Sequence, residues 1–596
     1  MMEPVLCPGT LEVNMDWDRK ARRGAAVADK LNYTGRFIIA DELPYSFGES
    51  VNYEYFNRVA LQPQYRRVPR NTLKRRTQQS YYAYRGYLME MFHTYDGRVS
   101  LTSDTWTSTY GESFVCVTAH WIDNDWLLRK RIICFEAMEE AHNGFNIKSR
   151  IVSCCKNFHL VDKIFSISLD NATANTSAMQ FLKEDPSIKL VLDGSLMHVR
   201  CCAHILNLCV QDGLDELRTL LEPIRNVIRW IRAARSAKRI YKQKCEEYGL
   251  RKKVIALDTP TRWNSTYKLL HDAIAYRDVL TDMYNESRAT DGQFITNDHW
   301  SLAKIVHDVL ETFDNATHIF SYVYEPNIHT VILECIKIIC TIKQTSLANP
   351  GVAVKRLLDN MKVKWCAYFT EFPPIYAIAA ILDPGVKLEG LTNLLTFYYQ
   401  QLDVQFDVPY YVNNCKRILE RLCEEYGAVI QPQPVGSSMG ASRFGILGPV
   451  LKKSRPDGSG SSSSSSSSSN IGVGEYLTYQ FETEENFHII EWWKNHSSKF
   501  PVLARIAKDI LAIPASTIAS ESAFSAGRRV LDEKRSRLSF ESIEMCVCKK
   551  DWDQAEKRTQ GLKEEDEEED DPWMTLDTSD SGGSGDGGNQ QQQQAP

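Results

Sequence analysis

The chain has no apolar run that reaches the about 18 residues of a membrane-spanning helix. Its N-terminus lacks the apolar core of a secretory signal peptide, so the sequence predicts neither a membrane protein nor a secreted one. A disulfide pattern is also absent, because the 16 cysteines are scattered and include adjacent pairs such as Cys154 and Cys155. This usage is typical of reduced thiols in the cytosol or the nucleus.

Excess positive charge is absent as well. The 596 residues carry a net charge of -6, which argues against a uniformly basic nucleic-acid-binding protein. Eight acidic residues are concentrated at 564–571, in a tail whose composition predicts disorder, so the rest of the chain is close to neutral. Against this background one basic stretch stands out, formed by Arg66, Arg67, Arg70, Lys74, Arg75 and Arg76. It is typical either of a phosphate-binding or nuclear-import patch or of a solvated helix face, and the sequence leaves both open.

The first third of the chain changes from a helical pattern to an alternation of strands and helices. Residues 1–95 are mixed and helical, and from Val99 apolar residues recur with a period of two in three consecutive runs. A helix around residues 147–158, a strand ending at Asp170, a short strand at 196–200 and another helix follow. Three antiparallel strands, helix, strand, helix and strand is the order of an α/β, ribonuclease-H-like sheet.

Three acidic residues suggest the chemistry. Asp104 and Asp170 stand where predicted strands end, and Glu521 lies far downstream. Carboxylates brought together at strand tips hold Mg²⁺ ions for phosphoryl transfer on nucleic acid. We therefore interpret the chain as a polynucleotide transferase or the remains of one. The alternatives are a helix cap for Asp170 and a solvent-facing helix position for Glu521.

Composition and periodicity divide the chain into six expected units. Apolar residues at helical spacing predict a long all-α region after the first strands, and the serine-rich stretch beyond it predicts a flexible linker. Order returns in a helical region in which Leu503, Ile506 and Ile510 form one stripe, interpreted as core packing or as a subunit interface. The expected units are 1–95, 96–212, 213–429, the linker 430–472, 473–555 and the acidic tail 556–596.

Five sequence blocks follow one another in the order seen in hAT transposases. The blocks are Leu101–Ser108, Leu169–Ala172, His198–Leu208, Thr261–Thr266 and Leu511–Glu521. On these blocks the chain resembles the hAT superfamily, most closely the transposase-derived proteins of the plant RICESLEEPER and DAYSLEEPER kind. The resemblance extends from about residue 16 to about residue 555.

The resemblance implies a role for several residues. Asp104, Asp170 and Glu521 match the family's acidic triad, which binds two divalent ions, Mg²⁺ or Mn²⁺. Cys201 and His204 match a Cys-x-x-His element that positions the scissile DNA strand, and a zinc site there is disfavoured because further ligands are lacking nearby. Arg262 and Trp263 match a motif whose tryptophan stacks on a flipped base. The alternative for Trp263 is a buried side chain at a helix start.

The resemblance also implies that copies of the chain assemble. The region 473–555 is similar to the family's C-terminal dimerisation region, which completes the core and predicts a homodimer or higher homo-oligomer. This similarity favours an interface for Trp492, Trp493, Leu503, Ile506 and Ile510.

The family's N-terminal BED zinc finger is not found, since Cys7 is the only cysteine before Cys116. This departure favours a nuclear DNA-binding dimer, domesticated or decayed, that regulates genes without cutting DNA. The alternative is an active Mg²⁺-dependent transposase. Neither function involves a small-molecule substrate.

Overall fold

A computed structural model describes residues 33–61, 63–108, 111–214, 219–259, 262–286, 295–429, 469–481, 487–530 and 538–559. The acidic tail beyond Thr559 and the first 32 residues lie outside these ranges. The expected linker 430–472 also lies outside them, except that a helix begins at Ser469. None of the described helices combines the length and the apolar character needed to cross a bilayer.

A five-stranded sheet forms the centre of the protein. Its strands are β1 (Val99–Thr107), β2 (Ser113–Ile122), β3 (Leu128–Ala137), β4 (Ile164–Leu169) and β5 (His198–Arg200). Their order is β3-β2-β1-β4-β5, with β1, β2 and β3 antiparallel and β4 and β5 parallel to β1. This topology confirms the predicted ribonuclease-H-like order. The burial of both faces of β2 explains its nearly continuous apolar sequence.

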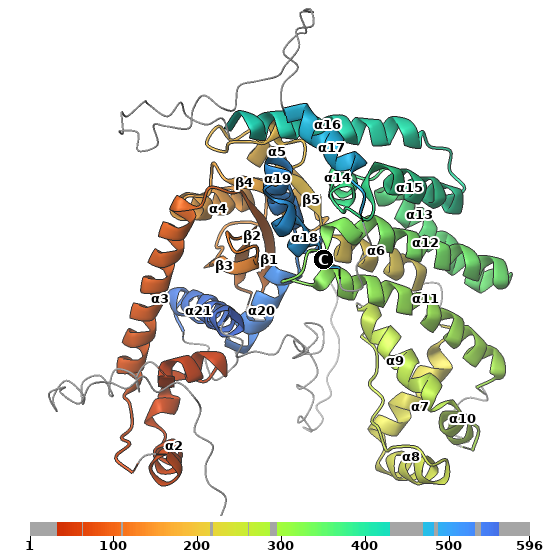
Figure 1. The fold of residues 1–596 in the computed structure, drawn as a ribbon. Helices are drawn as coiled ribbons and strands as arrows, with labels where there is room; N and C mark the ends of the chain where they lie inside the picture. Colours follow the sequence, from red (N-terminus) through yellow and green to blue (C-terminus); the bar gives the residue numbers. More distant parts are fainter. Residues whose placement is uncertain are drawn as a thin grey trace, which may run out of the picture.

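Helices cover both faces of the sheet (Figure 1). In this view α4 (Gly144–Asn157) and α5 (Thr173–Lys183) lie above the sheet, and α20 (Ile518–Val530) and α21 (Phe540–Thr559) lie below it. Helices α20 and α21 come from the far end of the chain, so the C-terminal region completes the core as predicted. Their aromatic and aliphatic side chains share one core with the strands.

Helix α21 also satisfies the backbone of the edge strand β3. The indole nitrogen of Trp552 donates a hydrogen bond to the carbonyl oxygen of Ile132 at 2.9 Å, and the Ile132 amide donates to the Asp551 carboxylate at 2.8 Å. Both bonds fall at a bulge, where the register between β2 and β3 shifts. An edge strand leaves such backbone groups unpaired unless another element covers them, so α21 closes this side of the sheet.

A long helical region stands between β5 and the C-terminal helices, on the right of Figure 1. It confirms the predicted all-α insertion between the second and third acids. Its elements are α6 (Cys202–Leu214), α7 (Glu222–Ala233), α8 (Arg235–Glu247), α9 (Trp263–Ala275), α10 (Arg277–Glu286), α11 (Asn297–Ser321), η5 (Ile328–Thr330), α12 (Val331–Ala348), α13 (Val352–Phe369), α14 (Pro374–Ile381), α15 (Lys387–Leu402) and α16 (Val408–Val429). The helices α17 (Ser469–Thr478), α18 (Ile489–His496) and α19 (Pro501–Leu511) pack into the same core.

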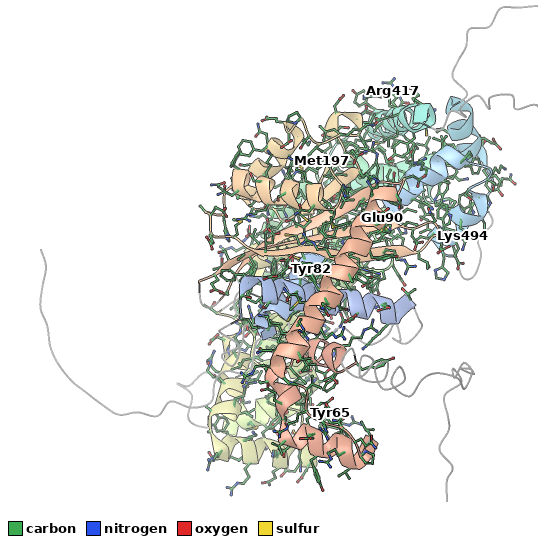
Figure 2. All side chains as sticks on the ribbon, turned by 90° about the vertical axis from the view of Figure 1, so that its left-hand side faces the viewer. Tyr65, Tyr82, Glu90, Met197, Arg417 and Lys494 are labelled. Carbon is green, nitrogen blue, oxygen red and sulfur yellow. The ribbon has the colours of Figure 1, made fainter. Side chains whose placement is uncertain are left out.

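The N-terminal part forms a small lobe at the foot of a long helix. The lobe contains η1 (Tyr45–Glu49), α2 (Val51–Phe56) and η2 (Asn57–Leu61), and the helix is α3 (Arg70–Thr94). Figure 2 shows α3 running from the lobe, near Tyr65, up past Tyr82 and Glu90 to the level of the sheet. The remaining short element is η3 (Leu192–Gly194), which precedes β5.

Candidate functional site: a carboxylate group at the sheet edge

The structure brings the three predicted acids to one end of the sheet. Strands β1 and β4 are parallel neighbours in which Thr102 pairs with Ser168. Asp104 and Asp170 each lie two residues further along, so they reach the same edge side by side. Glu521 belongs to the first turn of α20, which packs against β1 and β2. Asp170 directly follows β4, but Asp104 lies within β1, which continues to Thr107, so the prediction that both acids stand at strand ends was wrong for Asp104. The fold of the C-terminal region returns the distant acid to this pair.

Mutual repulsion and burial raise the pKa values of two of these acids. Burial raises the pKa of Asp104 well above its ordinary value of 3.8, and the carboxylates of Glu521 and Asp170 raise it further. Burial also raises the pKa of Glu521, as does Asp170, although a hydrogen bond from Thr517 acts in the opposite direction. Like charges held together in a partly buried site favour either protonation or the binding of a cation. The electrostatics therefore fit a site for divalent metal.

Backbone and side-chain donors orient each carboxylate. Asp104 accepts a hydrogen bond from the Thr105 amide at 2.7 Å. Asp170 accepts one from the Ala172 amide at 2.8 Å and another from the Asn175 side chain at 2.5 Å, just as α5 begins. The N-cap of α5 is Ala172 and it has no side-chain capping bond, so Asp170 is not the helix cap and contacts the turn that precedes the helix. This contact leaves Asp170 as one of the three acids facing the site.

Glu521 is held by a hydroxyl group one helical turn away. The Thr517 hydroxyl donates to Glu521 Oε1 at 2.9 Å and also lies 3.2 Å from the Cys201 sulfur. The backbone amide of Thr517 donates to the same sulfur at 3.3 Å. Cys201 follows β5, so this contact fixes the start of α20 against the strand that borders β4. Thr517 thus connects the third acid to the part of the sheet that carries the second.

A chain of buried hydroxyls fixes α20 from the other side. Thr102 on β1 lies 2.5 Å from the Thr118 hydroxyl and donates to Ser520 at 3.2 Å, and Ser520 donates to the Thr517 carbonyl at 2.8 Å. The chain ends at His120, whose ring nitrogen lies 2.8 Å from Thr118. Burial lowers the pKa of His120 to about 3, so this ring is neutral. A fully satisfied polar network of this kind specifies one packing arrangement.

The donor atoms fit a hard divalent cation. The site offers carboxylate oxygens, the ligand type that Mg²⁺ prefers. The buried Asn171 side-chain oxygen, next to Asp170, has no hydrogen-bond partner among the described residues and adds another oxygen near the site. The three acids are more widely spaced than a compact ligand cluster, whose ligand atoms would all lie within 4.8 Å of one another. This spacing suits ions shared between carboxylates better than one ion bound by all three.

The predicted Cys-x-x-His element plays a structural part in this arrangement. Cys201 is fully buried and accepts hydrogen bonds from Thr517 and from the His204 amide, the latter at 3.4 Å. Burial raises the pKa of the Cys201 thiol to about 12, so it stays a thiol and not the thiolate that binds metal. His204 is partly exposed on α6. A direct DNA contact is therefore sterically available to His204 and not to the Cys201 side chain.

Arg262 and Trp263 stand at the start of α9, which packs mainly against α11 and α6. The Trp263 side chain is only 3% exposed, and its ring meets Phe313 in a T-shaped contact with 6.4 Å between centroids. The structure thus shows the buried alternative. Stacking on a base stays a prediction that requires the tryptophan to leave this contact. Arg262 is partly exposed and precedes the first helical turn.

The five residues assigned to a dimer interface are buried within a single chain. Trp493, Ile506 and Ile510 have no exposed surface, and Trp492 and Leu503 are almost as deeply buried. The Trp493 indole nitrogen donates to the Leu382 carbonyl at 2.9 Å, which attaches α18 to the all-α region. This packing corrects the assignment of these side chains to an interface between copies. The periodicity signalled burial but not the partner, because an apolar stripe is the same for both.

The basic stretch lies on the N-terminal lobe and the first turns of α3. Arg67 pairs with Glu54 at 2.9 Å and Arg70 with Glu49 at 3.3 Å. Lys74 and Arg75 are exposed and have no ion-pair partner among the described residues. The other two members, Arg66 and Arg76, are exposed and partly exposed, respectively. Lys74 and Arg75 are therefore the charges of this stretch most open to a polyanion.

Comparison with known families assigns matching parts to this architecture. Family models match the ZBED1 RNase-like domain at residues 102–196 and the ZBED1 RNase-like helical domain at residues 199–309. They also match the hAT-like transposase RNase-H fold at residues 329–426 and the hAT family C-terminal dimerisation region at residues 474–552. The first match contains Asp104 and Asp170, and the last contains Glu521. The fold and the site thus define a hAT-type protein with a ribonuclease-H-like core, a helical domain and a dimerisation region.

Similar proteins agree with this class. The chain is 29% identical over 532 residues to the Putative AC transposase of Zea mays, a match that covers 87% of the chain and 65% of the maize protein. It is 27% identical over 552 residues to the zinc finger BED domain-containing protein RICESLEEPER 2 of Oryza sativa, covering 87% of the chain and 74% of that protein. The chain is 23% identical over 518 residues to the zinc finger BED domain-containing protein DAYSLEEPER of Arabidopsis thaliana, a match that covers 83% of the chain and 69% of that protein. Over most of its length the chain is therefore similar to transposases and transposase-derived proteins of the hAT group.

Sequence reasoning missed the residues that hold the acids in place. Thr517 lies four residues before Glu521, a spacing that puts both on one helix face, and this was an available signal. Asn175 lies five residues after Asp170 across a helix start, which the sequence does not single out. The contact of Thr517 with Cys201 joins residues 316 positions apart and has no local signal.

Proposed function

We propose that the chain is a nuclear DNA-binding protein whose sheet edge supports divalent-metal-dependent cleavage and joining of DNA strands. The observation that supports this proposal is the group formed by Asp104, Asp170 and Glu521. The repulsion between three carboxylates held in one site opposes folding. A transposase-derived protein that no longer catalysed a reaction would have no need to keep them oriented there. The name of the maize relative, Putative AC transposase, agrees with the proposal.

The three carboxylates would hold Mg²⁺ or Mn²⁺ at the edge of the sheet. Bound there, such ions polarise the phosphate and lower the pKa of an attacking water or 3′-hydroxyl group. The chain's own residues provide the positioning. Thr517 holds Glu521, Asn175 holds Asp170, and the Thr105 amide holds Asp104, so the oxygens are oriented before DNA arrives.

DNA binding and self-association complete the proposal. Lys74 and Arg75 present two exposed charges to the phosphate backbone. The dimerisation region at 474–552 supports self-association. Two copies joined in this way bind DNA more tightly than one copy because the second contact becomes intramolecular.

Nicking of supercoiled plasmid tests the proposed chemistry without knowledge of a preferred DNA sequence. Wild-type protein with Mn²⁺ should convert supercoiled plasmid to the open circular form, and chelation of the metal should abolish this. Glu521→Gln removes one carboxylate charge while keeping the shape of the side chain and should lower the rate at least a hundredfold, in line with the loss of a group that stabilises the transition state. Equal nicking by wild type and Glu521→Gln would contradict the proposal.

A gene regulator that binds DNA without cutting it is the second candidate. The burial of Trp263 and Cys201 favours it, because one side chain of each of the two motifs expected to handle the cleaved strand lies inside the core. This candidate predicts plasmid binding in a mobility-shift assay together with no nicking under any divalent metal. Nicking that depends on Glu521 would exclude it.

A further inference from the structure

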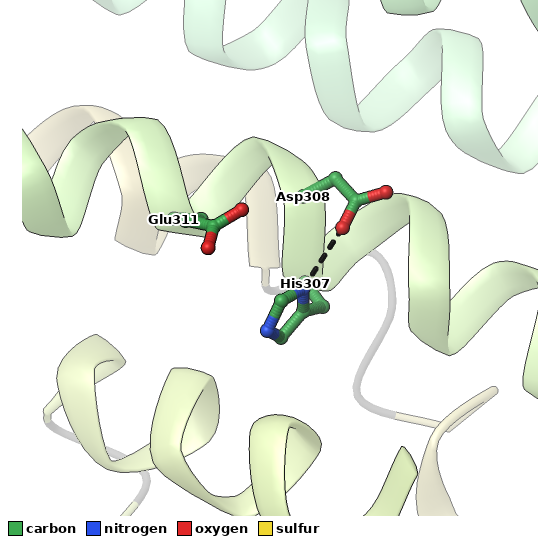
Figure 3. A group of neighbouring side chains, drawn as sticks. All are labelled: His307, Asp308 and Glu311. Carbon is green, nitrogen blue, oxygen red and sulfur yellow. Dashed lines mark hydrogen bonds and ion pairs between the residues drawn. The ribbon is translucent and has the colours of Figure 1, made fainter. Parts of the chain in front are cut away.

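Helices α9 and α11 carry a second group of ionisable side chains, remote in sequence from the acidic triad. The two helices meet at Trp263 and Phe313 near the start of α9, where Asn264 also donates to Asp314 at 3.3 Å. Two turns further along α9, His271 faces His307 of α11. The group also contains Asp308 and Glu311 of α11 (Figure 3). We refer to His271, His307, Asp308 and Glu311 as the histidine cluster.

The hydrogen bonds of the histidine cluster fix the proton positions. His307 Nδ1 lies 2.9 Å from Asp308 Oδ1, the bond drawn in Figure 3. A carboxylate only accepts, so Nδ1 of His307 carries the proton and Nε2 keeps its lone pair. That lone pair points toward Nδ1 of His271, which lies 3.2 Å away. The two nitrogens therefore face each other across a space that takes either one shared proton or one metal cation.

The distance between the two nitrogens matches a metal site. Tetrahedral Zn²⁺ holds imidazole nitrogens at about 2.0–2.1 Å, which puts two such nitrogens about 3.3 Å apart. Asp308 bound to the far nitrogen of His307 is the carboxylate partner that metal-binding histidines usually have. Glu311 lies one turn after His307, and its ligand atom falls within 4.8 Å of those of His307 and Asp308. His271 is not part of this 4.8 Å group, so Glu311, which is exposed, has to change its rotamer to reach an ion held between the two histidines.

The surroundings of the histidine cluster carry several acids of α11. Tyr267, one turn before His271, packs its ring on His307 with 5.2 Å between centroids. Burial raises the pKa of the Tyr267 hydroxyl, and the charges of Asp314, Glu311 and Asp308 raise it further. Lys304 balances one of these charges by its contact with Asp308. The excess of acid over base attracts a cation, and the exposed ring of His271 gives it a path from solvent.

We propose that His271 Nδ1, His307 Nε2 and the Glu311 carboxylate bind a divalent transition-metal ion of the zinc class, with Asp308 as the positioning residue behind His307. Two imidazoles and one carboxylate are ligands that favour Zn²⁺ over Mg²⁺, so the site is chemically distinct from the sheet edge. The bound ion joins α9 to α11 and holds the helix that begins with Trp263. Its binding energy adds to the stability of this helix pair.

Titration with Co²⁺, which replaces Zn²⁺ and is coloured, tests this proposal. The full chain without an affinity tag is used in excess Mg²⁺, which occupies carboxylate sites. We expect one Co²⁺ per chain with the visible absorption of a low-coordinate site, displaced by one equivalent of Zn²⁺. The near-ultraviolet band of cobalt bound to thiolate should be absent, because no cysteine belongs to the histidine cluster.

Variants identify the ligands. His271→Ala and Glu311→Gln should each weaken Co²⁺ binding at least tenfold, and Asp308→Asn should weaken it about 10–100-fold. The matched control is His318→Ala, because His318 is also on α11 and lies 3.3 Å from a carboxylate, that of Asp314, but faces no second histidine. It should bind as wild type. Because His271 is exposed, the His271→Ala protein should have the same melting temperature as wild type in the presence of a chelator.

Three results would overturn the proposal. One is wild-type protein that shows no visible cobalt absorption. Another is a cobalt spectrum dominated by thiolate ligation. The last is His271→Ala protein that binds Co²⁺ as tightly as wild type.

Discussion

At the scale of single residues, the assembly of the acidic site depends on the hydroxyl group of Thr517. It bonds to Glu521 in one direction and approaches the Cys201 sulfur in the other. Glu521 is otherwise a residue in the first turn of a helix, with several side-chain rotamers available. The Thr517 contact selects the rotamer that faces Asp104 and Asp170.

Removal of this hydroxyl should therefore weaken metal binding more than it weakens the fold. For Thr517→Ala we expect a Mn²⁺ affinity about 10–100-fold lower, as for other partners that orient metal ligands. The loss of stability should be about 1 kcal/mol, the usual net worth of such hydrogen bonds. Calorimetric titration and chemical denaturation measure the two effects. Thr517→Ser keeps the hydroxyl and should bind Mn²⁺ close to wild type, so an equally weak Thr517→Ser protein would argue against this role.

The raised pKa of Asp104 predicts a dependence on pH. In the folded protein Asp104 keeps its proton above the ordinary value of 3.8, so the folded state binds more protons than the unfolded state. Stability from this group is therefore present at low pH and is lost as pH rises through the folded pKa. Metal needs the ionised form, so Mn²⁺ affinity should rise over the same interval.

Asp104→Asn removes this titration. Without metal, the melting temperature of Asp104→Asn should increase relative to wild type as pH rises from 3.8. Thermal melts across a pH series with a chelator measure the difference. A difference that stays constant with pH would show that Asp104 is not perturbed in the folded protein.

At the scale of elements, the position of α20 depends on close contact with the sheet. Gly527 of α20 lies against the Phe135 ring of β3, where an added Cβ would approach the ring carbon at 2.7 Å. Phe524, one turn earlier, stacks with Trp106 at 5.8 Å between centroids. Glycine is therefore required so that the helix carrying Glu521 can approach the strands.

Gly527→Ala should push α20 away from the sheet. We expect a loss of about 1–3 kcal/mol in the free energy of unfolding, typical of overpacking, together with weaker Mn²⁺ binding through Glu521. The matched control is Gly86→Ala, because Gly86 is also within a helix but an added Cβ there meets nothing within 4 Å. That substitution should stabilise the protein by about 0.5–1 kcal/mol. Denaturant titrations of both variants test this, and a neutral Gly527→Ala would contradict the close contact.

The sequence allows the sheet to be predicted more fully than the site. Alternating apolar residues from Val99 and the strand ending at Asp170 are local signals, so the order of β1 to β5 could be read directly. The return of Glu521 to this sheet could be expected only from the hAT resemblance, because no local pattern connects residues so far apart. The histidine cluster combines His271 and His307 from two helices, and the spacing of four residues between His307 and Glu311 was the only local signal for it.

Periodicity also could not show what covers an apolar helix face. Trp263 and Leu503 lie on apolar helix faces, and the sequence does not say whether DNA, a second copy or the same chain covers such a face. The structure shows that the same chain covers both. The residue types were read correctly as apolar contacts, and the partner depends on tertiary packing.

At the scale of the whole molecule, the buried stripe of α19 bears on self-association. Leu503→Ala should lower the free energy of unfolding by about 2–5 kcal/mol, because it opens a cavity in the core. The folded fraction should keep the wild-type oligomeric state, since Leu503 is 2% exposed within one chain. Chemical denaturation and sedimentation measure the two properties. A stable monomeric variant would instead place Leu503 in the interface.

The basic stretch should govern the salt dependence of DNA binding. Replacing Lys74 and Arg75 by alanine removes two exposed charges, so the slope of log affinity against log salt should fall by about 2. Fluorescence anisotropy with duplex DNA at several salt concentrations measures the slope. Arg417→Ala is the control, because Arg417 is exposed on α16 and lies at the opposite end of the molecule in Figure 2 from Tyr65, near which α3 begins. A slope unchanged in the double variant would remove this stretch from the DNA interface.

The most direct measurement is Mn²⁺ binding followed by electron paramagnetic resonance of the free ion. It tests the central claim that Glu521 joins Asp104 and Asp170 in one metal site. We predict that Glu521→Gln and Asp104→Asn each lower Mn²⁺ affinity at least tenfold, whereas His271→Ala leaves it unchanged. A Glu521→Gln protein that binds Mn²⁺ as tightly as wild type would show that the distant acid takes no part in the site.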